Sequence, residues 1–328
     1  MLTEPFSEGS VEMSKLQIWF LDVGHGDCAY IQLPNGARMM IDCGCGADHW
    51  PSEFLKYYKI TKDGAPVNIP NNANRYGLDK LVISHPHGDH IADIEAIHES
   101  IGFYLLAGGY RPFIDKISIE QIDWRKRSQD IAKKFVGVVK KYCGTYEASK
   151  DNVRNAKPDC IANGQRFVEY TDGIDLNEIS FLYSFEIGGH KVLFTGDLTA
   201  AAVAKILKSD KASKFKEFVR GTTILKVPHH GRDNGCSQEM FDAFGRQPLL
   251  CILSDEILNE NNEGTANTQW YTDRTSREKV NINGTMSDNR VLSTRKFKDI
   301  YIEISVDGKV TVNTNALKEA KEKIYGNS

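Results

Sequence analysis

The chain has 328 residues, of which 41% are hydrophobic and 26% charged, and its formal net charge is −3 at pH 7. This composition is typical of a globular protein and argues against disorder and against tight, nonspecific binding to duplex nucleic acid. No apolar run approaches the roughly 18 residues of a membrane span, and the first residues lack a secretion signal, so we expect no membrane association and a cytoplasmic location. The seven cysteines form no CxxC pair, which argues against a disulfide framework or a structural zinc knuckle.

The first fifty residues predict mainly β-structure, and a further strand is predicted near residue 80. Short apolar or alternating runs at 16–23, 28–33 and 37–42, separated by turn sequences, are typical of a β-meander. The run at 80–85 has the pattern of a buried strand and continues directly into the sequence "HPHGDH", residues 85–90. We therefore expect the polar side chains of this sequence to lie at the carboxyl end of a strand.

Helical periodicity follows from about 91 to 142, and the segment 124–166 carries eleven Lys and Arg residues against four Asp and Glu. We predict a helical, basic insertion at about 95–165 that lies over the face carrying the histidines. A solvated helical face is the alternative interpretation, because lysine pairs are common on exposed helices.

The second half alternates strands and helices. The predicted elements are two strands joined by a Gly-Gly turn within 178–197, a helix at 198–209, a strand at 222–231, a helix at 237–244 and a strand at 249–254. A C-terminal tail at about 290–328 is predicted to contain a hairpin around Asp307 and Gly308 and a final helix. This order favours two β-sheets with helices outside, in a single domain spanning 14–328.

The sequence "HPHGDH" places three histidines and an aspartate within six positions. Neutral imidazole and carboxylate are ligands for Zn²⁺ and similar cations. The alternation directs the rings of His85 and His87 one way, whereas Asp89 and His90 turn toward a second position, so one segment can serve two metals. Four potential ligands brought together by accident on a solvated loop are the less favoured explanation.

These residues match the HxHxDH motif of the metallo-β-lactamase superfamily, and other segments agree in order. Residues 21–44, "LDVGHGDCAYIQLPNGARMMIDCG", resemble the DVGQGD…IDAG opening of the hydrolase domain in ComEC-type competence proteins. "LFTGDL" at 193–198 resembles its bridging-aspartate segment, "LKVPHHG" at 225–231 its closing KxPHHGS segment, and "STRKFKDIYIEI" at 293–304 its last strands. The resemblance implies a four-layer αββα metallo-β-lactamase sandwich, with two mixed β-sheets and helices outside, and a stand-alone hydrolase.

The resemblance also implies two divalent metal ions, Zn²⁺ or Mn²⁺, and assigns their ligands. One ion is assigned to His85 and His87, the other to Asp89 and His90, a bridging position to Asp197, and completion of the second site to His229 or His230. A shared carboxylate is physically reasonable, because two cations about 4 Å apart need an anion that offsets their repulsion.

Further polar residues are expected to support these ligands. Asp42 corresponds to the first motif of the superfamily, and its expected role is to accept a hydrogen bond from a ligand imidazole. Asp22 and Asp27 are expected to support ligands in the same way. His25 stands where the competence proteins usually have glutamine, and it is either a neighbour of the ligands or only a turn residue.

One ligand of the superfamily has no counterpart here. Its third motif usually supplies a histidine before the bridging aspartate, but this chain has no histidine between 99 and 189. ComEC-like proteins commonly have an Asn/Ser-rich stretch there, and Asn177 and Ser180 are the local counterparts, so we expect one metal to be weakly held. Arg232 stands where the subgroup has serine after "HHG", and this difference bears on substrate choice.

Two such ions supply the chemistry of hydrolysis, because they lower the pKa of bound water to about 7 and neutralise charge on a phosphoryl or carbonyl oxygen. We predict a phosphodiesterase or nuclease that uses a metal-bound hydroxide on nucleic acid or an oligonucleotide. The predicted catalytic residues are Asp89, Lys226 and Arg232, the last two because positive charge beside the metals suits a phosphate. Two alternatives stay open: a hydrolase of carboxylic esters, lactones or thioesters, and a catalytically silent, metal-poor binding or signalling module.

Overall fold

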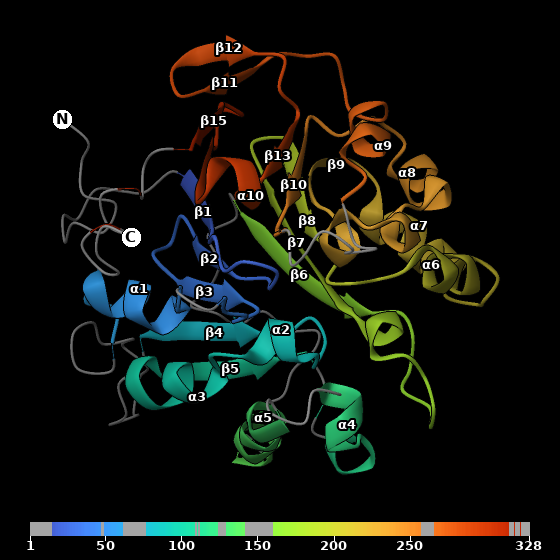
Figure 1. Ribbon diagram of the computed structural model, residues 1–328. Coiled ribbons are helices and arrows are strands. Elements are labelled where there is room, and N and C mark those ends of the chain that lie inside the picture. The colour runs from blue at the N-terminus through green and yellow to red at the C-terminus, as the bar shows by residue number, and fades with distance from the viewer. Residues whose placement is uncertain are drawn as a thin grey trace.

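The computed structural model describes residues 15–46, 49–61, 77–108, 110, 112–123, 129–141, 160–256 and 266–314, together with Lys318 and Glu322. The strands within these residues form two mixed β-sheets (Figure 1). The first sheet contains, in spatial order, β12 (Thr285–Ser287), β11 (Val280–Ile282), β15 (Val310–Asn313), β14 (Ile300–Ser305), β1 (Lys15–Phe20), β2 (Ala29–Gln32), β3 (Arg38–Ile41), β4 (Leu78–Val82) and β5 (Phe103–Ala107). The second contains β13 (Val291–Ser293), β10 (Leu250–Leu253), β9 (Thr222–Lys226), β8 (His190–Phe194), β7 (Phe181–Ile187) and β6 (Ile161–Arg166).

Helices of the first half pack on the first sheet, and helices of the second half on the second. The first group is α1 (Pro51–Tyr57), α2 (Gly88–Ile91), α3 (Ile94–Ala96), the π-helix η1 (Ile97–Ile101), the 3-10 helix η2 (Ile114–Lys116), α4 (Ile119–Ile122) and α5 (Gln129–Lys141). The second group is α6 (Ala200–Leu207), α7 (Ala212–Val219), α8 (Gln238–Phe244) and α9 (Thr268–Thr272). The remaining helices are the 3-10 helices η4 (Leu176–Ile179), η5 (Pro228–Gly231) and η6 (Asp233–Gly235), and α10 (Thr294–Phe297).

Three hydrophobic clusters hold these layers together. Alternate residues of β1, such as Phe20, face a core shared by both sheets, where the ring of Phe20 stacks on Phe194 of β8 at 5.6 Å. The intervening Trp19 points to the opposite face, which packs with helices that include α1 and α5. The outer face of the second sheet is covered by α6, α7 and α8. The predicted four-layer αββα sandwich with two mixed sheets is therefore confirmed (Figure 1).

The strand pairing brings one end of each sheet to the same region. In the first sheet β3, β4 and β5 are parallel, and in the second β8, β9 and β10 are parallel. The carboxyl ends of neighbouring parallel strands meet at one edge, so the loops after β3, β4, β8 and β9 gather there. These loops carry most of the residues predicted to form the site.

The structure differs from the sequence predictions at several element boundaries. Strand β5 lies inside the stretch 91–142, for which helices were predicted. The prediction was wrong here because periodicity alone cannot distinguish a short apolar run between two glycines from a buried helical turn. Strand β4 ends at Val82, so the motif histidines follow the strand after a short loop. The extent of the basic insertion stays a prediction, since residues 124–128 and 142–159 lie outside the described ones. The final helix also stays a prediction, because only Lys318 and Glu322 within it are described. The Nζ atom of Lys318 lies 3.9 Å from Oε1 of Glu322.

None of the helices that the structure describes is both long and apolar enough to cross a membrane.

A buried carboxylate at the start of α3 joins this helix to α1 and predicts a pH effect on stability. The Oδ2 atom of Asp93 accepts a hydrogen bond of 2.6 Å from the backbone N–H of Ser52 at the start of α1. Burial raises the pKa of Asp93 from 3.8 to about 6. A carboxyl pKa raised by folding contributes stability that is present below about pH 4 and lost as the pH rises through about 6.

We expect the substitution Asp93→Asn to remove this pH dependence, because asparagine can keep the bond to Ser52 without an ionisable group. The difference in unfolding free energy between the variant and the unchanged protein should shift by about 3 kcal/mol in favour of the variant when the pH is raised from 4 to 7. Urea denaturation of both metal-free proteins at the two pH values measures the difference. A difference that is the same at both pH values would contradict the assignment.

Candidate metal centre

Backbone hydrogen bonds bind the loops of the site closely together. The N–H of Asp27, in the loop between β1 and β2, donates to the carbonyl of Asp89 at 3.2 Å, and the N–H of Cys43 donates to the carbonyl of His90 at 2.8 Å. Gly44 permits the closest approach, since a Cβ atom at this position would lie 1.9 Å from the carbonyl oxygen of Asp89. The loop after β1, the loop after β3 and the sequence "HPHGDH" therefore form one packed unit.

His85 and His87 lie side by side after β4. The Nε2 atom of His85 is 3.0 Å from Nδ1 of His87 and 3.7 Å from Oδ2 of Asp197. Burial, and next the neighbouring His90, hold the pKa of His85 well below its usual range, so that this ring is neutral. A neutral imidazole is the form that binds a metal.

Asp42 bonds the ring of His90; the sequence led us to expect a bond to an imidazole but did not indicate which one. Its Oδ2 atom lies 2.9 Å from Nδ1 of His90 and accepts a second bond of 2.7 Å from the hydroxyl of Ser84. The backbone of Asp42 is in the left-handed region, with φ at 57°, a conformation that costs a residue other than glycine free energy. With Nδ1 bound to Asp42, the Nε2 atom of His90 is the one that faces Asp197, 3.4 Å from its Oδ1.

His229 and His230 occupy the strained turn η5. Their φ angles are 47° and 53°, so two consecutive residues with side chains adopt the left-handed conformation. As a result both rings approach Asp197, with their Nε2 atoms 3.7 Å and 3.6 Å from its Oδ2. The Nδ1 atom of His230 lies 3.0 Å from the carbonyl oxygen of Ser254 and donates to it, which leaves Nε2 without a proton when the ring is neutral.

Asp89 and His25 lie on the other side of His230. The Oδ2 atom of Asp89 is 3.4 Å from Nε2 of His230, and the ring centroids of His25 and His230 are 4.5 Å apart. Burial, and next the neighbouring His230, lower the pKa of His25 to about 3, so this ring is neutral as well. His25 is therefore a member of the site and not only a turn residue.

The donor set fits divalent cations. Among the described residues, ligand atoms within 4.8 Å of one another occur in His85, His90 and Asp197 and in His25, Asp89 and His230. Nε2 of His90, Nε2 of His230 and Oδ1 of Asp197 are buried without a hydrogen bond in this part of the chain. Burial opposes a charge on His90, yet Asp197 and Asp42 hold its pKa well above the usual range. The site thus attracts positive charge, which a metal ion supplies in place of protons.

Asp27 and Lys226, two further predicted site residues, form a buried ion pair. The Nζ atom of Lys226 is 2.6 Å from Oδ1 and 2.9 Å from Oδ2 of Asp27. Burial opposes ionisation of Asp27, but the neighbouring ammonium lowers the pKa of this carboxyl. The charge of Lys226, predicted to face a phosphate, is therefore offset by an anion within the protein.

The other predicted supporting residues differ in their distance from the ligands. Ser180 receives a bond of 3.1 Å from the backbone N–H of Asp197 and so fixes the loop of the predicted bridge. Asp22 contacts the C-terminal part of the first sheet, where its N–H donates to Asp299 at 2.7 Å and its Oδ2 lies 3.4 Å from Lys298. The backbone N–H of Asn177 donates to Oδ1 of Asp175, the residue before η4, and the buried Oδ1 of Asn177 has no hydrogen-bond partner among the described residues.

The described part of the basic segment is helix α5. Ion pairs join Lys133 to Asp130 at 3.0 Å, Lys134 to Glu95 at 2.5 Å and Lys140 to Asp115 at 2.5 Å. These pairs are exposed, and exposed pairs contribute only about 0–1 kcal/mol each, so another anion can replace the acidic partner.

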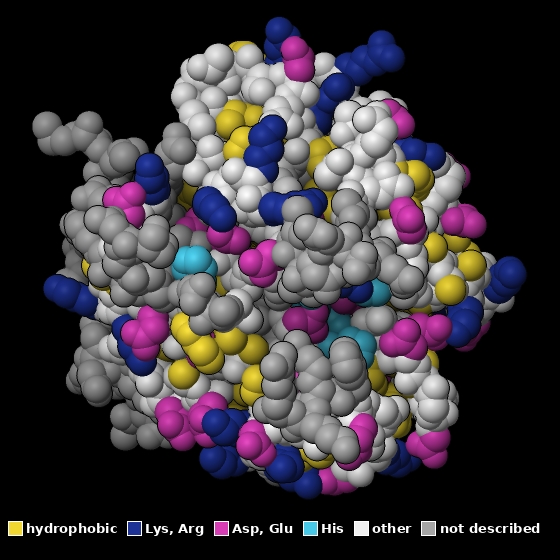
Figure 2. Space-filling view, in the orientation of Figure 1, with side chains coloured by type: hydrophobic (Ala, Val, Ile, Leu, Met, Phe, Trp, Pro, Cys, Tyr) yellow, Lys and Arg dark blue, Asp and Glu magenta, His cyan; other side chains and the backbone are white. Residues whose placement is uncertain are grey.

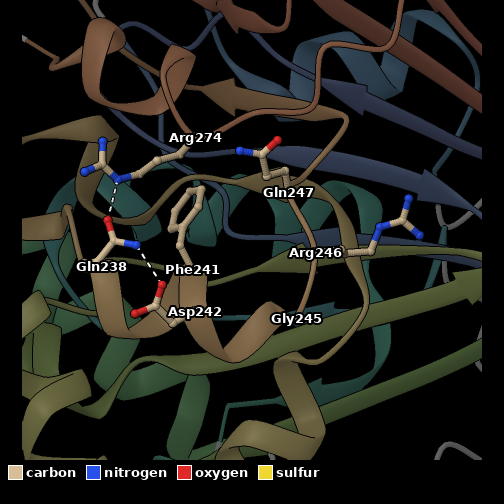
Figure 3. A pocket seen from close by; sticks show the side chains of 7 residues that line it. All are labelled: Gln238, Phe241, Asp242, Gly245, Arg246, Gln247 and Arg274. Carbon is tan, nitrogen blue, oxygen red and sulfur yellow. Dashed lines mark hydrogen bonds between the residues drawn. The ribbon is translucent and has the colours of Figure 1, made fainter.

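Histidine and acidic side chains reach the surface together in a hollow on the face shown in Figure 2. A separate pocket of about 270 Å³ lies beside α8 and α9, and its lining residues are Gln238, Phe241, Asp242, Gly245, Arg246, Gln247 and Arg274 (Figure 3). Arg274 is held there by Gln238 at 2.7 Å. None of these residues belongs to the histidine cluster, so the pocket is not part of the candidate site.

The model of the metallo-β-lactamase superfamily matches residues 21–245, and the chain therefore belongs to this superfamily. Similar solved structures include the metallo-β-lactamase fold protein YhfI from Bacillus subtilis, with 12% identity, a TM-score of 0.41 and coverage of 91% of this chain and 99% of that chain. Zn²⁺-bound PqqB from Methylobacterium extorquens has 11% identity, a TM-score of 0.38 and coverage of 93% and 95%. No curated protein sequence matches the chain. Structural similarity at this level carries no argument about substrate.

Besides the ion pair of Asp27 and Lys226, sequence reasoning missed two contacts in the site. The hydroxyl of Ser84 lies 3.2 Å from Nδ1 of His85 and also donates to Asp42, which bonds His90. Ser84 therefore helps to orient both His85 and His90. Its position directly before the motif was the available signal. The second contact joins Nη2 of Arg232 to Nε2 of His25 at 2.6 Å, and no local sequence pattern predicts it.

We expect Asp42→Asn to weaken metal binding. Asparagine presents an N–H where Oδ2 accepts from His90, so the ring must accept on Nδ1 and carry its proton on Nε2, the nitrogen needed for a metal. The expected loss is about 10–100-fold in Zn²⁺ affinity, measured by competition with a chromophoric chelator. Asp130→Asn on α5 is the control and should leave the affinity unchanged. Equal affinities for both variants would show that Asp42 does not position His90.

Proposed function

We propose that the chain is a phosphodiesterase or nuclease with two divalent metal ions, similar to the ComEC-type hydrolase domain, that acts on nucleic acid or oligonucleotides in the cytoplasm. The observation that carries the proposal is the convergence on Asp197. Nitrogens of four histidines lie 3.4–3.7 Å from its two carboxylate oxygens, and these residues are His85, His90, His229 and His230. A carboxylate surrounded in this way is suited to bridge two cations.

In this proposal His85 and His87 hold one ion, and Asp89, His90 and His230 hold the other. The Nε2 atoms of His85, His229 and His230 all lie 3.6–3.7 Å from Oδ2 of Asp197. We group His230 with the second ion because its Nε2 also lies 3.4 Å from Asp89, and we assign His229 to the first ion, where it would take the place of the histidine that the third motif lacks. The Zn²⁺ or Mn²⁺ ions supply an activated water and offset the charge that develops on the phosphorus oxygens.

The remaining residues act by orienting these groups. Asp42 and Ser84 keep the protons of His90 and His85 on Nδ1, and Ser254 does the same for His230. Lys226 keeps Asp27 ionised at the base of the site, and we assign it no direct phosphate contact.

A phosphodiester substrate is favoured by the charge next to the ligands. Arg232 directly follows η5, two residues after His230, and its Nε atom is buried without a hydrogen bond in the described part of the chain. A guanidinium with an unused donor beside two cations suits a phosphate better than a neutral ester.

The test compares two small substrates on metal-loaded protein. We expect hydrolysis of bis(p-nitrophenyl) phosphate, and cleavage of single-stranded oligonucleotides, that require Zn²⁺ or Mn²⁺ and stop after dialysis against EDTA. Hydrolysis of p-nitrophenyl acetate without any phosphodiesterase activity would overturn the proposal in favour of a carboxylic ester hydrolase. Absence of both activities in a metal-loaded protein would favour a silent binding module.

Helix α5 offers a further prediction about long substrates. Replacing Lys133, Lys134, Lys140 and Lys141 by glutamine should weaken binding to long single strands. It should also make the slope of log affinity against log salt less steep by about 0.7 for each lost phosphate contact, because fewer counterions are released on binding. Turnover of bis(p-nitrophenyl) phosphate should not change. An unchanged salt slope would exclude α5 from the nucleic-acid interface.

A further inference from the structure

His25 and Arg232 form a contact that the predicted metal ligands do not account for. The Nη2 atom of Arg232 lies 2.6 Å from the Nε2 atom of His25, although 207 positions separate the two residues. His25 belongs to the loop between β1 and β2 of the first sheet, and Arg232 follows η5 of the second. The contact therefore joins the two halves of the sandwich across the site.

The chemistry of the two groups fixes the direction of this hydrogen bond. A guanidinium has donors only, so Nε2 of His25 accepts and carries no proton. The single proton of the neutral ring is then on Nδ1. That atom is buried and has no hydrogen-bond partner among the described residues. A buried donor without an acceptor costs free energy, which a ligand that accepts the bond would recover.

The ring of His25 lies within the candidate metal centre. A ring nitrogen of His25, a carboxylate oxygen of Asp89 and a ring nitrogen of His230 are within 4.8 Å of one another. The Nε–H of Arg232 is a second buried donor without a partner in the described part of the chain. Direct metal binding by His25 is disfavoured, because its free electron pair is on the nitrogen that accepts from Arg232.

We propose that His25 and Arg232 form an oxyanion-binding subsite beside the metal ligands, which binds an oxygen of a phosphoryl group. His25 contacts the anion through Nδ1–H, and Arg232 positions His25 and adds positive charge. The inference rests on the proposed function and deepens it, since it assigns recognition of the substrate phosphate to residues other than the metal ligands.

The test uses inorganic phosphate as the probe and protein loaded with Zn²⁺ and freed of excess metal. His25→Phe keeps a ring against His230 but removes both nitrogens, and we expect phosphate binding, measured by calorimetric titration, to weaken about tenfold or more. Zinc content per chain should stay the same. His25→Gln supplies an oxygen for Arg232 and an N–H for the anion, and it should restore binding to within about threefold of the original value.

Three results would overturn the subsite: phosphate that binds equally to the His25→Phe variant, zinc that is lost with the ring, or a starting protein that does not bind phosphate. The proposed function fails separately. If phosphate binds through His25 but no phosphodiester is cleaved, only the reaction assignment is wrong. If phosphodiesters are cleaved with the same KM by both proteins and phosphate binding is unaffected, only the subsite is wrong.

Discussion

Replacing Asp197 by alanine is expected to abolish metal binding and activity together. This carboxylate is the group on which four histidine side chains converge, and it is almost fully buried. In the proposed two-metal site, its loss would leave the two cations without an anion between them, and their repulsion would oppose binding of the second ion. We expect turnover to fall by about 10³-fold or more, which corresponds to about 4 kcal/mol of transition-state stabilisation.

The readouts for this variant are metal content and turnover of bis(p-nitrophenyl) phosphate. Circular dichroism should show the same secondary structure, because Asp197 lies in a loop and contributes no side chain to the hydrophobic clusters. Asp130→Asn, on the surface of α5, serves as the control for loss of a carboxylate. An Asp197→Ala protein with full metal content would exclude the bridging role.

The substitution Gly44→Ala is expected to damage the site without changing any polar group. The added methyl group would lie 1.9 Å from the carbonyl oxygen of Asp89 and 2.9 Å from the backbone nitrogen of Asp27. These are backbone atoms, so both loops must shift. We expect a loss of about 3 kcal/mol in unfolding free energy and weaker metal binding, because Asp89 is moved from its position.

Gly137→Ala provides a matched control for the same chemical change. Gly137 is an exposed residue inside α5, and a Cβ atom there meets nothing within 4 Å. Alanine favours the helix over glycine, so this variant should gain about 0.5–1 kcal/mol. Denaturation curves of the two variants therefore shift in opposite directions. If Gly44→Ala is as stable as the unchanged protein and binds metal normally, the close packing of the two loops is wrong.

The fold and the candidate ligands were predictable where the signal is local. The sequence "HPHGDH" places four candidate ligands within six positions, and the strands before it have clear apolar patterns. A bond between Asp42 and a histidine ring was expected through the resemblance, but the identity of that partner, His90, 48 positions away, was not. In each case the residue types restrict the chemistry enough to make one arrangement favoured.

Contacts that depend on how the two sheets pack could not be predicted. The bond from Arg232 to His25 spans the sandwich, and neither residue type demands the other. The ion pair of Lys226 with Asp27 likewise joins the end of β9 to a loop 199 positions away, and it changes the expected role of that lysine. Local periodicity also fails at β5, whose position at the edge of the first, mixed sheet is a property of the whole fold.

The most direct test of the account is the metal content of the purified protein. After incubation with Zn²⁺ or Mn²⁺ and removal of free ions, elemental analysis should find about two metal ions per chain, as expected for two cations bridged by one carboxylate. The count should fall below one in the Asp197→Ala variant. A starting protein that holds well under one ion per chain under the same conditions would contradict the metal centre and the hydrolytic function built on it.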